Sequence, residues 1–314
     1  MENIYDVIIV GAGPAGLSAG LYSARAKMKT LILEKDRTGG QITGTEEVAN
    51  YPGSIKDATG PTLVARMVEQ AESFGAERLK ADVIGFEFEG HLKIVKTDKG
   101  DYKTKSIILA MGARPRQLGV PKEKELTGKG ISYCATCDAE FFTDLDVVVF
   151  GGGDTALEEA MFIAKFARKV TIVHRREEFR AAKSIIEKAK NNSKIEFIFN
   201  SGAKKFIGDG MVQGLELENY ITGTCTEILA DENDGLMGVF VFVGYLPQTE
   251  LVKDKLNCDT TGYIVTDELM QTGIPGVFAA GDIRAKSLRQ VVTATADGAI
   301  AAVQAEKYVD SLEN

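Results

Sequence analysis

Two stretches of the chain repeat one pattern of apolar runs and glycine-rich turns. In the first, residues 6–10 form a short apolar run that ends at Gly11, and a segment rich in small residues follows over 17–27. A second apolar run, 30–33, ends at Glu34. Continuous apolar runs bounded by glycine are typical of buried parallel strands, so this stretch predicts a strand, a crossover helix and a second strand.

The turn after the first strand reads Gly-Ala-Gly-Pro-Ala-Gly at 11–16, in the context that a dinucleotide-binding fingerprint requires. Gly11 permits the tight turn, Gly13 lets the backbone approach a pyrophosphate, and Gly16 lets the helix pack on the strand. The pyrophosphate then lies on the amides of the helix N-terminus. Glu34 ends the second strand, where it can accept hydrogen bonds from a ribose. These features predict a dinucleotide site.

A capped helix and an antiparallel meander are predicted next. Thr59 can cap the helix, Pro61 suits its first turn, and Gly75 can end it. Short alternating runs from 81 to 109, broken by Glu-Gly and Lys-Gly turns, predict the meander. Two turn-rich segments, Gly-Gly-Gln at 39–41 and Asn-Tyr-Pro-Gly at 50–53, lie where the far end of a bound dinucleotide would reach.

The same pattern recurs at a constant offset of 140 residues. Residues 146–150 form another apolar run, Gly-Gly-Gly-Asp-Thr-Ala follows at 151–156, and a further strand is predicted over 170–173. A second meander is predicted between 194 and 243. The constant offset predicts an internal repeat of a whole dinucleotide-binding domain.

Both copies end on Gly-x-x-Pro, at 112–115 and at 244–247, where we place the crossings between domains. The tail holds an apolar strand that stops at Gly281-Asp282 and a predicted helix, 288–312, which would complete the sheet of the first copy. The predicted fold class is α/β, with two Rossmann-like domains that each carry a small antiparallel meander. The second is inserted in the first: the domains are 1–115 with 244–314, and 116–243.

The two copies differ at the residue that ends the second strand. Adding 140 to Glu34 gives His174, which opens a basic cluster with Arg175, Arg176 and Arg180. A carboxylate at this place favours a free ribose hydroxyl, whereas guanidinium groups favour a 2′-phosphate, which they bind bidentately. The alternative is a solvated basic start to a helix predicted over 177–190. The position in the repeat favours FAD in the first copy and NADPH in the second.

Length and composition limit the classes of function. At 314 residues the chain is long enough for about two domains. A net charge of −8 argues against a general nucleic-acid binder and against docking on anionic lipid. We see neither a signal peptide nor an apolar run long enough to span a membrane. Four cysteines suit a reducing compartment, so we expect a cytoplasmic protein without a membrane partner.

Two of the cysteines form a Cys-x-x-Cys pair, Cys134 and Cys137, followed directly by Asp138. Such a pair can close a small disulfide ring, and the adjacent carboxylate can exchange a proton with the released thiol. Half of a zinc site has the same spacing, but a four-ligand site needs a second close pair or nearby histidines. Cys225 and Cys258 are isolated, so we predict redox chemistry, no metal site, and two small buried apolar thiols.

With these motifs placed, the chain resembles the low-molecular-weight thioredoxin reductases of bacteria along essentially its whole length. The resemblance rests on both phosphate loops, on segments 39–41, 50–53 and 134–138, on the basic cluster, and on Gly281-Asp282 and Arg289-Gln290, all in family order. It implies an FAD-containing homodimer that carries electrons from NADPH through flavin and a Cys134–Cys137 disulfide to oxidised thioredoxin.

The resemblance also assigns roles to single residues. Asp138 would act as the acid for the dithiol, and Arg289 and Gln290 would lie at the flavin ring. The family usually has Gly after that aspartate, and Ala139 fits there unless the backbone needs a positive φ. The predicted FAD residues are Gly11, Gly13, Pro14, Ala15, Gly16, Glu34, Gly40, Gln41, Asn50, Gly112, Gly281, Asp282, Arg289 and Gln290. The predicted NADPH residues are Gly151, Gly153, Asp154, Thr155, Ala156, His174, Arg175, Arg176 and Arg180.

The cysteines and the NADPH loop belong to the same inserted domain, yet both must reach the flavin of the other. We therefore expect this domain to rotate about the crossings near 115 and 244, with Cys137 facing the ring and Cys134 attacking thioredoxin.

Four alternatives share features with this chain. Some flavin-dependent thioredoxin reductases take electrons from ferredoxin and lack a working pyridine-nucleotide site; the intact second phosphate loop and the arginines weigh against this one. A peroxiredoxin-linked flavoprotein would carry an extra N-terminal redox region, and the related ferredoxin–NADP reductases lack the cysteine pair. A nucleotide-binding sensor or scaffold would have no use for a Cys-x-x-Cys-Asp motif.

Overall fold

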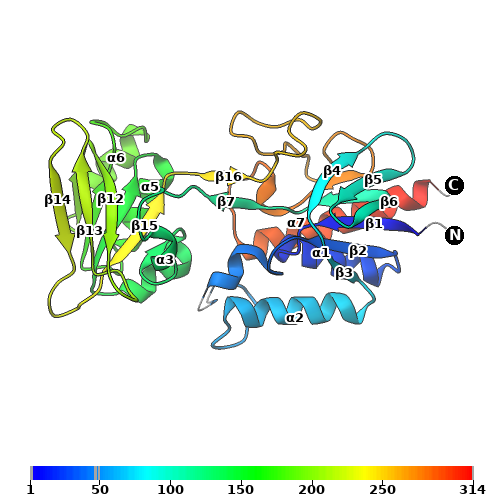
Figure 1. The fold of residues 1–314 in the computed structure, drawn as a ribbon, viewed down its shortest axis with the longest axis horizontal. Coiled ribbons are helices and arrows are strands. Elements are labelled where there is room, and N and C mark those ends of the chain that lie inside the picture. Colours follow the sequence, from blue (N-terminus) through cyan, green and yellow to red (C-terminus); the bar gives the residue numbers. More distant parts are fainter. Residues whose placement is uncertain (1–2, 46–47, 49, 313–314) are drawn as a thin grey trace. The chain divides into compact units, whose positions relative to one another are not determined.

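The computed structural model describes residues 3–45, 48 and 50–312. The chain divides into two compact units, which are joined by two crossings (Figure 1). Unit 1 combines Met1–Arg114 with Leu246–Asn314, and unit 2 is Pro115–Tyr245. At the crossings, β7 (Ala113–Pro115) and β16 (Tyr245–Pro247) pair with each other in a two-stranded ladder.

Unit 1 is built on a sheet with the strand order β3-β2-β1-β6-β5-β4, and β17 pairs with β6 as well. The parallel part joins β1 to β2, β2 to β3, β1 to β6 and β6 to β17, whereas β4, β5 and β6 form an antiparallel meander. The strands are β1 (Ile4–Val10), β2 (Thr30–Glu34), β3 (Glu77–Lys80), β4 (Val83–Glu87), β5 (Lys93–Thr97), β6 (Gly100–Leu109) and β17 (Val277–Ala279). The long strand β6 serves both parts, because its first half faces β5 and its second half lies between β1 and β17.

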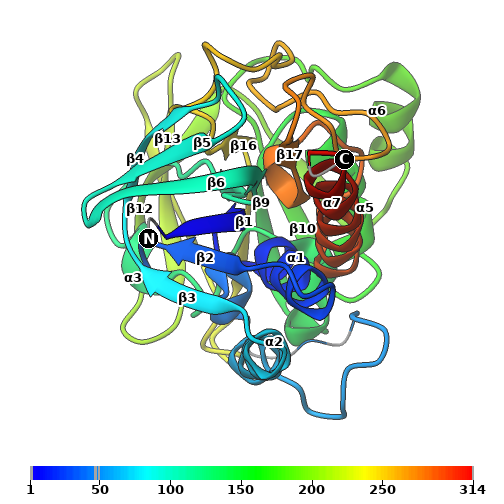
Figure 2. The same ribbon diagram turned by 90° about the vertical axis from the view of Figure 1, so that its right-hand side faces the viewer.

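Three helices cover unit 1: α1 (Pro14–Arg25), α2 (Gly60–Ser73) and α7 (Val291–Ser311). α1 and α7 lie side by side, as Figure 2 shows. Their backbones approach closely at Gly298, where an added Cβ would lie 2.1 Å from the carbonyl oxygen of Ala15. Thr59 caps α2 and Pro61 lies in its first turn, and Gly75 follows its C-terminus at φ +99°, so the predicted start and stop signals are confirmed.

Unit 2 repeats the arrangement. Its parallel sheet has the order β11-β10-β9-β15-β8, and a separate antiparallel sheet joins β12, β13 and β14. The strands are β8 (Ile131–Ser132), β9 (Asp146–Gly151), β10 (Lys169–Val173), β11 (Ile195–Ile198), β12 (Ser201–Ile207), β13 (Gly214–Asn219), β14 (Cys225–Leu229) and β15 (Gly238–Phe242). The helices of unit 2 are α3 (Glu123–Leu126), α4 (Ala135–Asp138), α5 (Asp154–Ile163) and α6 (Lys183–Lys190). Short 3₁₀ turns also occur: η2 (Ala139–Phe142) in unit 2, and η1 (Gly40–Gly44) and η3 (Gly281–Ile283) in unit 1.

The repeat predicted from the sequence is therefore confirmed as a pair of Rossmann-like units: β1-α1-β2 and β9-α5-β10 have the same connection and the same parallel pairing. Each unit holds its own apolar core beneath its helices. Among the described residues, no helix has both the length and the apolar composition that a membrane crossing requires.

The helix predicted over 177–190 is shorter than expected, because α6 begins only at Lys183. The preceding residues are drawn into other contacts: the amide of Arg180 donates to the carbonyl of Gly152 at 2.8 Å, and that of Ala182 donates to Oδ1 of Asp154 at 2.7 Å. These amides donate to the residues of the phosphate loop instead of to carbonyl groups within the predicted helix. Tertiary contacts therefore override local helix propensity here, and the helix starts later.

Candidate active site

The first phosphate loop of unit 1 has the backbone that its glycines predict. Gly11 has φ +105°, and a Cβ there would lie 2.4 Å from the carbonyl oxygen of Ala110. Gly13 caps α1 without a side-chain hydrogen bond, so the amides of the first turn face outward from the helix end. Oε2 of Glu34 accepts from the amide of Ala12 at 2.8 Å, and Oε1 accepts from the amide of Asp36 at 2.9 Å. Glu34 thus ties the loop to the end of β2.

Several predicted FAD residues of unit 1 meet at this loop. An added Cβ on Gly40 would lie 3.8 Å from Cα of Gly13, and one on Gly281 would lie 2.8 Å from Cβ of Ala15. Gly281 itself has φ +79°, which favours glycine. The structure therefore brings together residues that are up to about 270 positions apart in the sequence.

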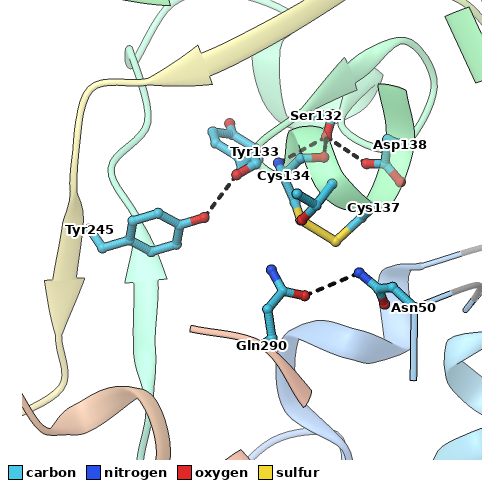
Figure 3. Close-up of a disulfide and its surroundings, with 9 residues drawn as sticks. Asn50, Ser132, Tyr133, Cys134, Cys137, Asp138, Tyr245 and Gln290 are labelled. Atoms are coloured by element: carbon cyan, nitrogen blue, oxygen red, sulfur yellow. Dashed lines mark hydrogen bonds between the residues drawn. A yellow bond between two sulfur atoms is a disulfide. The ribbon is translucent and has the colours of Figure 1, made fainter. Parts of the chain in front are cut away.

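Other predicted FAD residues form contacts among themselves. Nδ2 of Asn50 donates to Oε1 of Gln290 at 3.2 Å (Figure 3). The side-chain amide of Gln41 donates to the carbonyl oxygen of Ala113, next to Gly112, which has φ +69°. Each of these side chains is thereby oriented from within unit 1.

Two buried polar atoms of unit 1 indicate a ligand. Oδ1 of Asp282 and Nε of Arg289 are buried and have no hydrogen-bond partner among the described residues. Burial raises the pKa of the Asp282 carboxyl, and the nearby Lys286 and Arg289 partly oppose this. A buried polar group without a partner is costly, so the pair is suited to a bound molecule with hydroxyl donors and polar acceptors. The sugar alcohol chain and ring of FAD supply both kinds of group, and the site fits that cofactor.

The second phosphate loop lies in unit 2. A Cβ on Gly151 would lie 2.4 Å from Cβ of Ala156, and Gly153 caps α5 with open space around it. Asp154 and Thr155 are exposed in the first turn of α5. The loop has the same helix-terminus geometry as its counterpart in unit 1 and fits a second pyrophosphate.

The basic cluster divides into one buried and three exposed residues. Arg175, Arg176 and Arg180 are exposed, and within the described part of the chain their guanidinium groups form no hydrogen bond or ion pair. His174 is buried: a Cβ on Gly152 would lie 2.1 Å from its Nδ1, and its Nε2 lies 3.1 Å from the carbonyl oxygen of Glu178. Burial lowers the pKa of His174, so at neutral pH the ring is neutral and supports the loop, while the arginines carry the charge.

The redox pair lies in unit 2 at the start of α4. Cys134 and Cys137 form a disulfide, and both residues are half-buried. Cys134 caps α4, and the amide of Asp138, at the end of the same turn, donates to the carbonyl of Cys134 at 3.2 Å. Oγ of Ser132 lies between them: it accepts from the amide of Cys134 at 3.1 Å and lies 2.5 Å from Oδ2 of Asp138 (Figure 3).

The residue between Ser132 and Cys134 is held from two sides. The hydroxyl of Tyr133 donates to Oε1 of the buried Glu123 at 2.9 Å, and the hydroxyl of Tyr245 donates to the carbonyl of Tyr133 at 2.8 Å. Burial, with the neighbouring Glu123 carboxylate, raises the pKa of Tyr133, so its hydroxyl keeps its proton and remains a donor. Sequence reasoning missed these supporting residues, since no motif links them to the cysteines.

Two further expectations can be compared with the structure. Ala139 has φ −60°, a helical value that any residue adopts, so the absence of glycine after Asp138 has no cost. The prediction of two buried apolar thiols is wrong for Cys225, which is exposed on β14 with Nζ of Lys204 3.0 Å from its sulfur. Cys258 is partly buried against the core of unit 1.

Two dinucleotide-binding folds in one chain, with a Cys-x-x-Cys disulfide in the second, define a nucleotide-dependent disulfide oxidoreductase. The model of the family described as pyridine nucleotide-disulphide oxidoreductase matches residues 5–298. A thioredoxin reductase from Peptoclostridium litorale is 62% identical over 99% of both chains, and one from Peptoclostridium acidaminophilum is 60% identical over 99% of both. The crystal structure of thioredoxin reductase from Streptococcus pyogenes matches with a TM-score of 0.91 at 43% identity, covering 99% of this chain and 100% of that one.

The chain thus belongs to the thioredoxin reductases within the pyridine nucleotide-disulphide oxidoreductase family. It is an oxidoreductase and a flavoenzyme, and its family uses FAD and NADPH.

Proposed function

We propose that this chain carries electrons from NADPH, through FAD and the Cys134–Cys137 disulfide, to oxidised thioredoxin. The observation that carries the proposal is the disulfide itself, half-buried at the start of α4, with the carboxyl group of Asp138 hydrogen-bonded to Ser132 next to it. A structural disulfide has no need of an adjacent acid, whereas a dithiol that cycles between states must gain and lose a proton.

FAD is assigned to unit 1. The backbone amides of Ala15 and Gly16, which follow Pro14 in the first turn of α1, would bind its pyrophosphate. Glu34 would accept from its ribose, and Asp282 would accept from a hydroxyl of the sugar alcohol chain. Both oxygens of Glu34 already accept one backbone amide, and each keeps a lone pair for a further donor. Arg289, whose guanidinium carbon lies 4.0 Å from the ring centre of Tyr263, would turn its partnerless Nε to the flavin.

NADPH is assigned to unit 2. The loop from Gly151 to Ala156 would hold the pyrophosphate at the start of α5, and the exposed Arg175, Arg176 and Arg180 would hold the 2′-phosphate. His174 would act indirectly, by supporting the loop at Gly152.

When bound, NADPH supplies a hydride and FAD passes its two electrons to the disulfide. Those electrons break the S–S bond, one sulfur takes a proton from Asp138, and the other remains a thiolate. We assign the flavin-facing sulfur to Cys137 and the attack on thioredoxin to Cys134. The new mixed disulfide is then resolved by Cys137, which restores the Cys134–Cys137 bond and leaves thioredoxin as the dithiol.

Three further features belong to the same proposal: a homodimer, a cytoplasmic location, and rotation of unit 2 about the crossings at β7 and β16. The rotation is supported by where the assigned residues lie. The residues assigned to FAD are in unit 1, whereas both cysteines and the residues assigned to NADPH are in unit 2. A covalent lock between the units should stop turnover; full activity of the locked protein would contradict the rotation.

An anaerobic titration tests the proposal. The flavin absorbance of the purified protein should bleach rapidly on addition of NADPH, slowly with NADH, and recover when oxidised thioredoxin is added. Bleaching by chemically reduced ferredoxin but not by NADPH would instead support the ferredoxin-dependent alternative, and the exposed arginines would then be ordinary surface residues.

A further inference from the structure

Ser132 is placed to act on both parts of the redox site at once. It ends β8, two residues before Cys134, and its side chain is almost fully buried. Its Oγ accepts from the amide of Cys134 at 3.1 Å, lies 3.3 Å from the carbonyl oxygen of the same residue, and lies 2.5 Å from Oδ2 of Asp138 (Figure 3).

A hydroxyl has one proton to donate, so only one of the two nearby oxygens can receive it fully. The Asp138 oxygen is closer by 0.8 Å, and when the carboxyl group is ionised it is also the stronger acceptor. The amide of Cys134 meanwhile occupies a lone pair of the same Oγ. The geometry therefore fixes the direction of the chain of hydrogen bonds: from the Cys134 amide to Ser132, and from Ser132 to Oδ2 of Asp138.

We propose that Ser132 is a positioning residue that orients the Asp138 carboxyl for proton transfer to the dithiol. With Oδ2 occupied by the serine hydroxyl, the proton that Asp138 exchanges lies on Oδ1. The same hydroxyl fixes the peptide of Cys134, so the acid and the attacking sulfur share one anchor. This inference rests on the acid role proposed for Asp138.

The proton accounting follows from the proposed reaction. Reduction of the disulfide puts two electrons into the S–S bond, and the proton on Oδ1 of Asp138 passes to one sulfur, which leaves a carboxylate and one thiolate. The serine bond to Oδ2 stabilises that carboxylate. When Cys137 resolves the mixed disulfide with thioredoxin, its proton returns to Asp138. The two sulfurs released on thioredoxin become thiols by taking the proton equivalent that the NADPH hydride supplies and one proton from solvent. Ser132 neither gains nor loses a proton over the cycle.

The test measures turnover with thioredoxin in Ser132→Ala. Each rate is divided by the rate of electron transfer from NADPH to ferricyanide, which bypasses the disulfide, so that losses of folded enzyme or bound FAD cancel. Loss of one hydrogen bond to a charged group corresponds to roughly a tenfold to hundredfold fall in normalised kcat. The KM for thioredoxin should stay unchanged, because the buried hydroxyl of Ser132 cannot touch a protein substrate.

A double-mutant cycle separates positioning from general support of the fold. If Ser132 acts through Asp138, Ser132→Ala combined with Asp138→Asn should be no slower than Asp138→Asn alone. The matched control is Ser201→Ala, which also removes a buried hydroxyl from unit 2, one that donates to the carbonyl of Phe199 at 2.9 Å. This control should keep the wild-type rate.

Three results would overturn the inference: a wild-type normalised rate in Ser132→Ala, an additive loss in the double variant, or an equal loss in Ser201→Ala. If Asp138→Asn lowers the normalised turnover and Ser132→Ala does not, only the role of Ser132 is refuted. A fast Asp138→Asn would refute the proposed acid as well, so the two failures are distinguishable.

Discussion

Removal of the Asp297 carboxylate should destabilise unit 1 and weaken its hold on FAD together. Asp297 lies in α7 and is buried with two cations: its Oδ2 is 2.7 Å from Nζ of Lys286, and its Oδ1 is 3.3 Å from Nη1 of Arg284. Oδ2 also accepts from the amide of Gly281 at 3.0 Å. One carboxylate therefore joins α7 to the turn that carries Asp282 and to the segment that leads to Arg289.

The size of the effect follows from burial. The side chains of Asp297 and Lys286 are 9% and 8% exposed, so solvent cannot replace the lost partner. Removing one member of a buried ion pair costs about 3–5 kcal/mol, because the remaining charge stays buried without compensation. A domain of roughly 150–250 residues loses about 2–4 °C of Tm per kcal/mol. Asp297→Ala should therefore lower the Tm of unit 1 by roughly 6–20 °C.

Scanning calorimetry of the apoprotein measures this shift, and retention of FAD during repeated ultrafiltration measures the effect on the cofactor. Glu87→Ala is the matched control, since Glu87 pairs with Lys96 at 2.5 Å in the same unit but on the surface, where water compensates the loss. It should leave both measurements unchanged. If the Tm of the Asp297→Ala apoprotein lies within about 2 °C of the wild-type value, the reasoning is refuted. Loss of one member of a buried ion pair should lower the free energy of unfolding by more than such a shift allows.

The remaining predictions concern unit 2. Gly152→Ala would place a Cβ 2.1 Å from Nδ1 of His174, so the loop must move. Titration of this variant with NADPH should show weaker binding, while its FAD content stays unchanged. Wild-type affinity for NADPH would contradict this prediction. Replacing Arg175 and Arg176 with Ala should raise the KM for NADPH roughly tenfold or more while that for NADH changes little, and equal effects on both would mean that the pair does not hold the 2′-phosphate. Burial lowers the pKa of His174 in the folded chain from 6.5, so the unfolded chain binds the extra proton. The contribution of the neutral ring to the free energy of unfolding is therefore complete above about pH 6.5. It is lost as the pH falls through the lower pKa of His174 in the folded chain. Urea midpoints should fall more on acidification in wild type than in His174→Gln, and identical pH dependence would show that the histidine makes no contribution.

The parts that the sequence predicts well are those whose causes are local. A strand, a glycine turn and a helix N-terminus follow one another within about 20 residues, and each glycine has a steric reason that holds in any such unit. Gly11 with its positive φ and Thr59 at its cap position are examples, and the offset of 140 residues gives the second unit from the first.

The parts that the sequence predicts poorly depend on contacts between distant residues. The helix predicted from Glu177 starts late because Arg180 and Ala182 bond to the phosphate loop, some 28 residues earlier in the chain. Cys225 is exposed because β14 lies at the edge of a three-stranded sheet, a position that no local pattern around the cysteine reveals. In the sequence, Asp297 is only one of several polar residues in α7, and only the fold shows that it contacts Lys286.

One pair of positions indicates how the same backbone could bind different nucleotides in the two units, as we propose. Position 12 and position 34 are in contact in unit 1, where the amide of Ala12 donates to Glu34, and the equivalent positions are in contact in unit 2, where His174 fills the space behind Gly152. In both units the residue at the end of the second strand secures the phosphate loop. The glutamate can also accept from a ribose with its remaining lone pairs, but the buried neutral histidine offers no charge to a phosphate. If unit 2 binds NADPH as we propose, the positive charge that favours NADPH over NADH must therefore come from further along the chain, and Arg175 and Arg176 are the first exposed cations after His174.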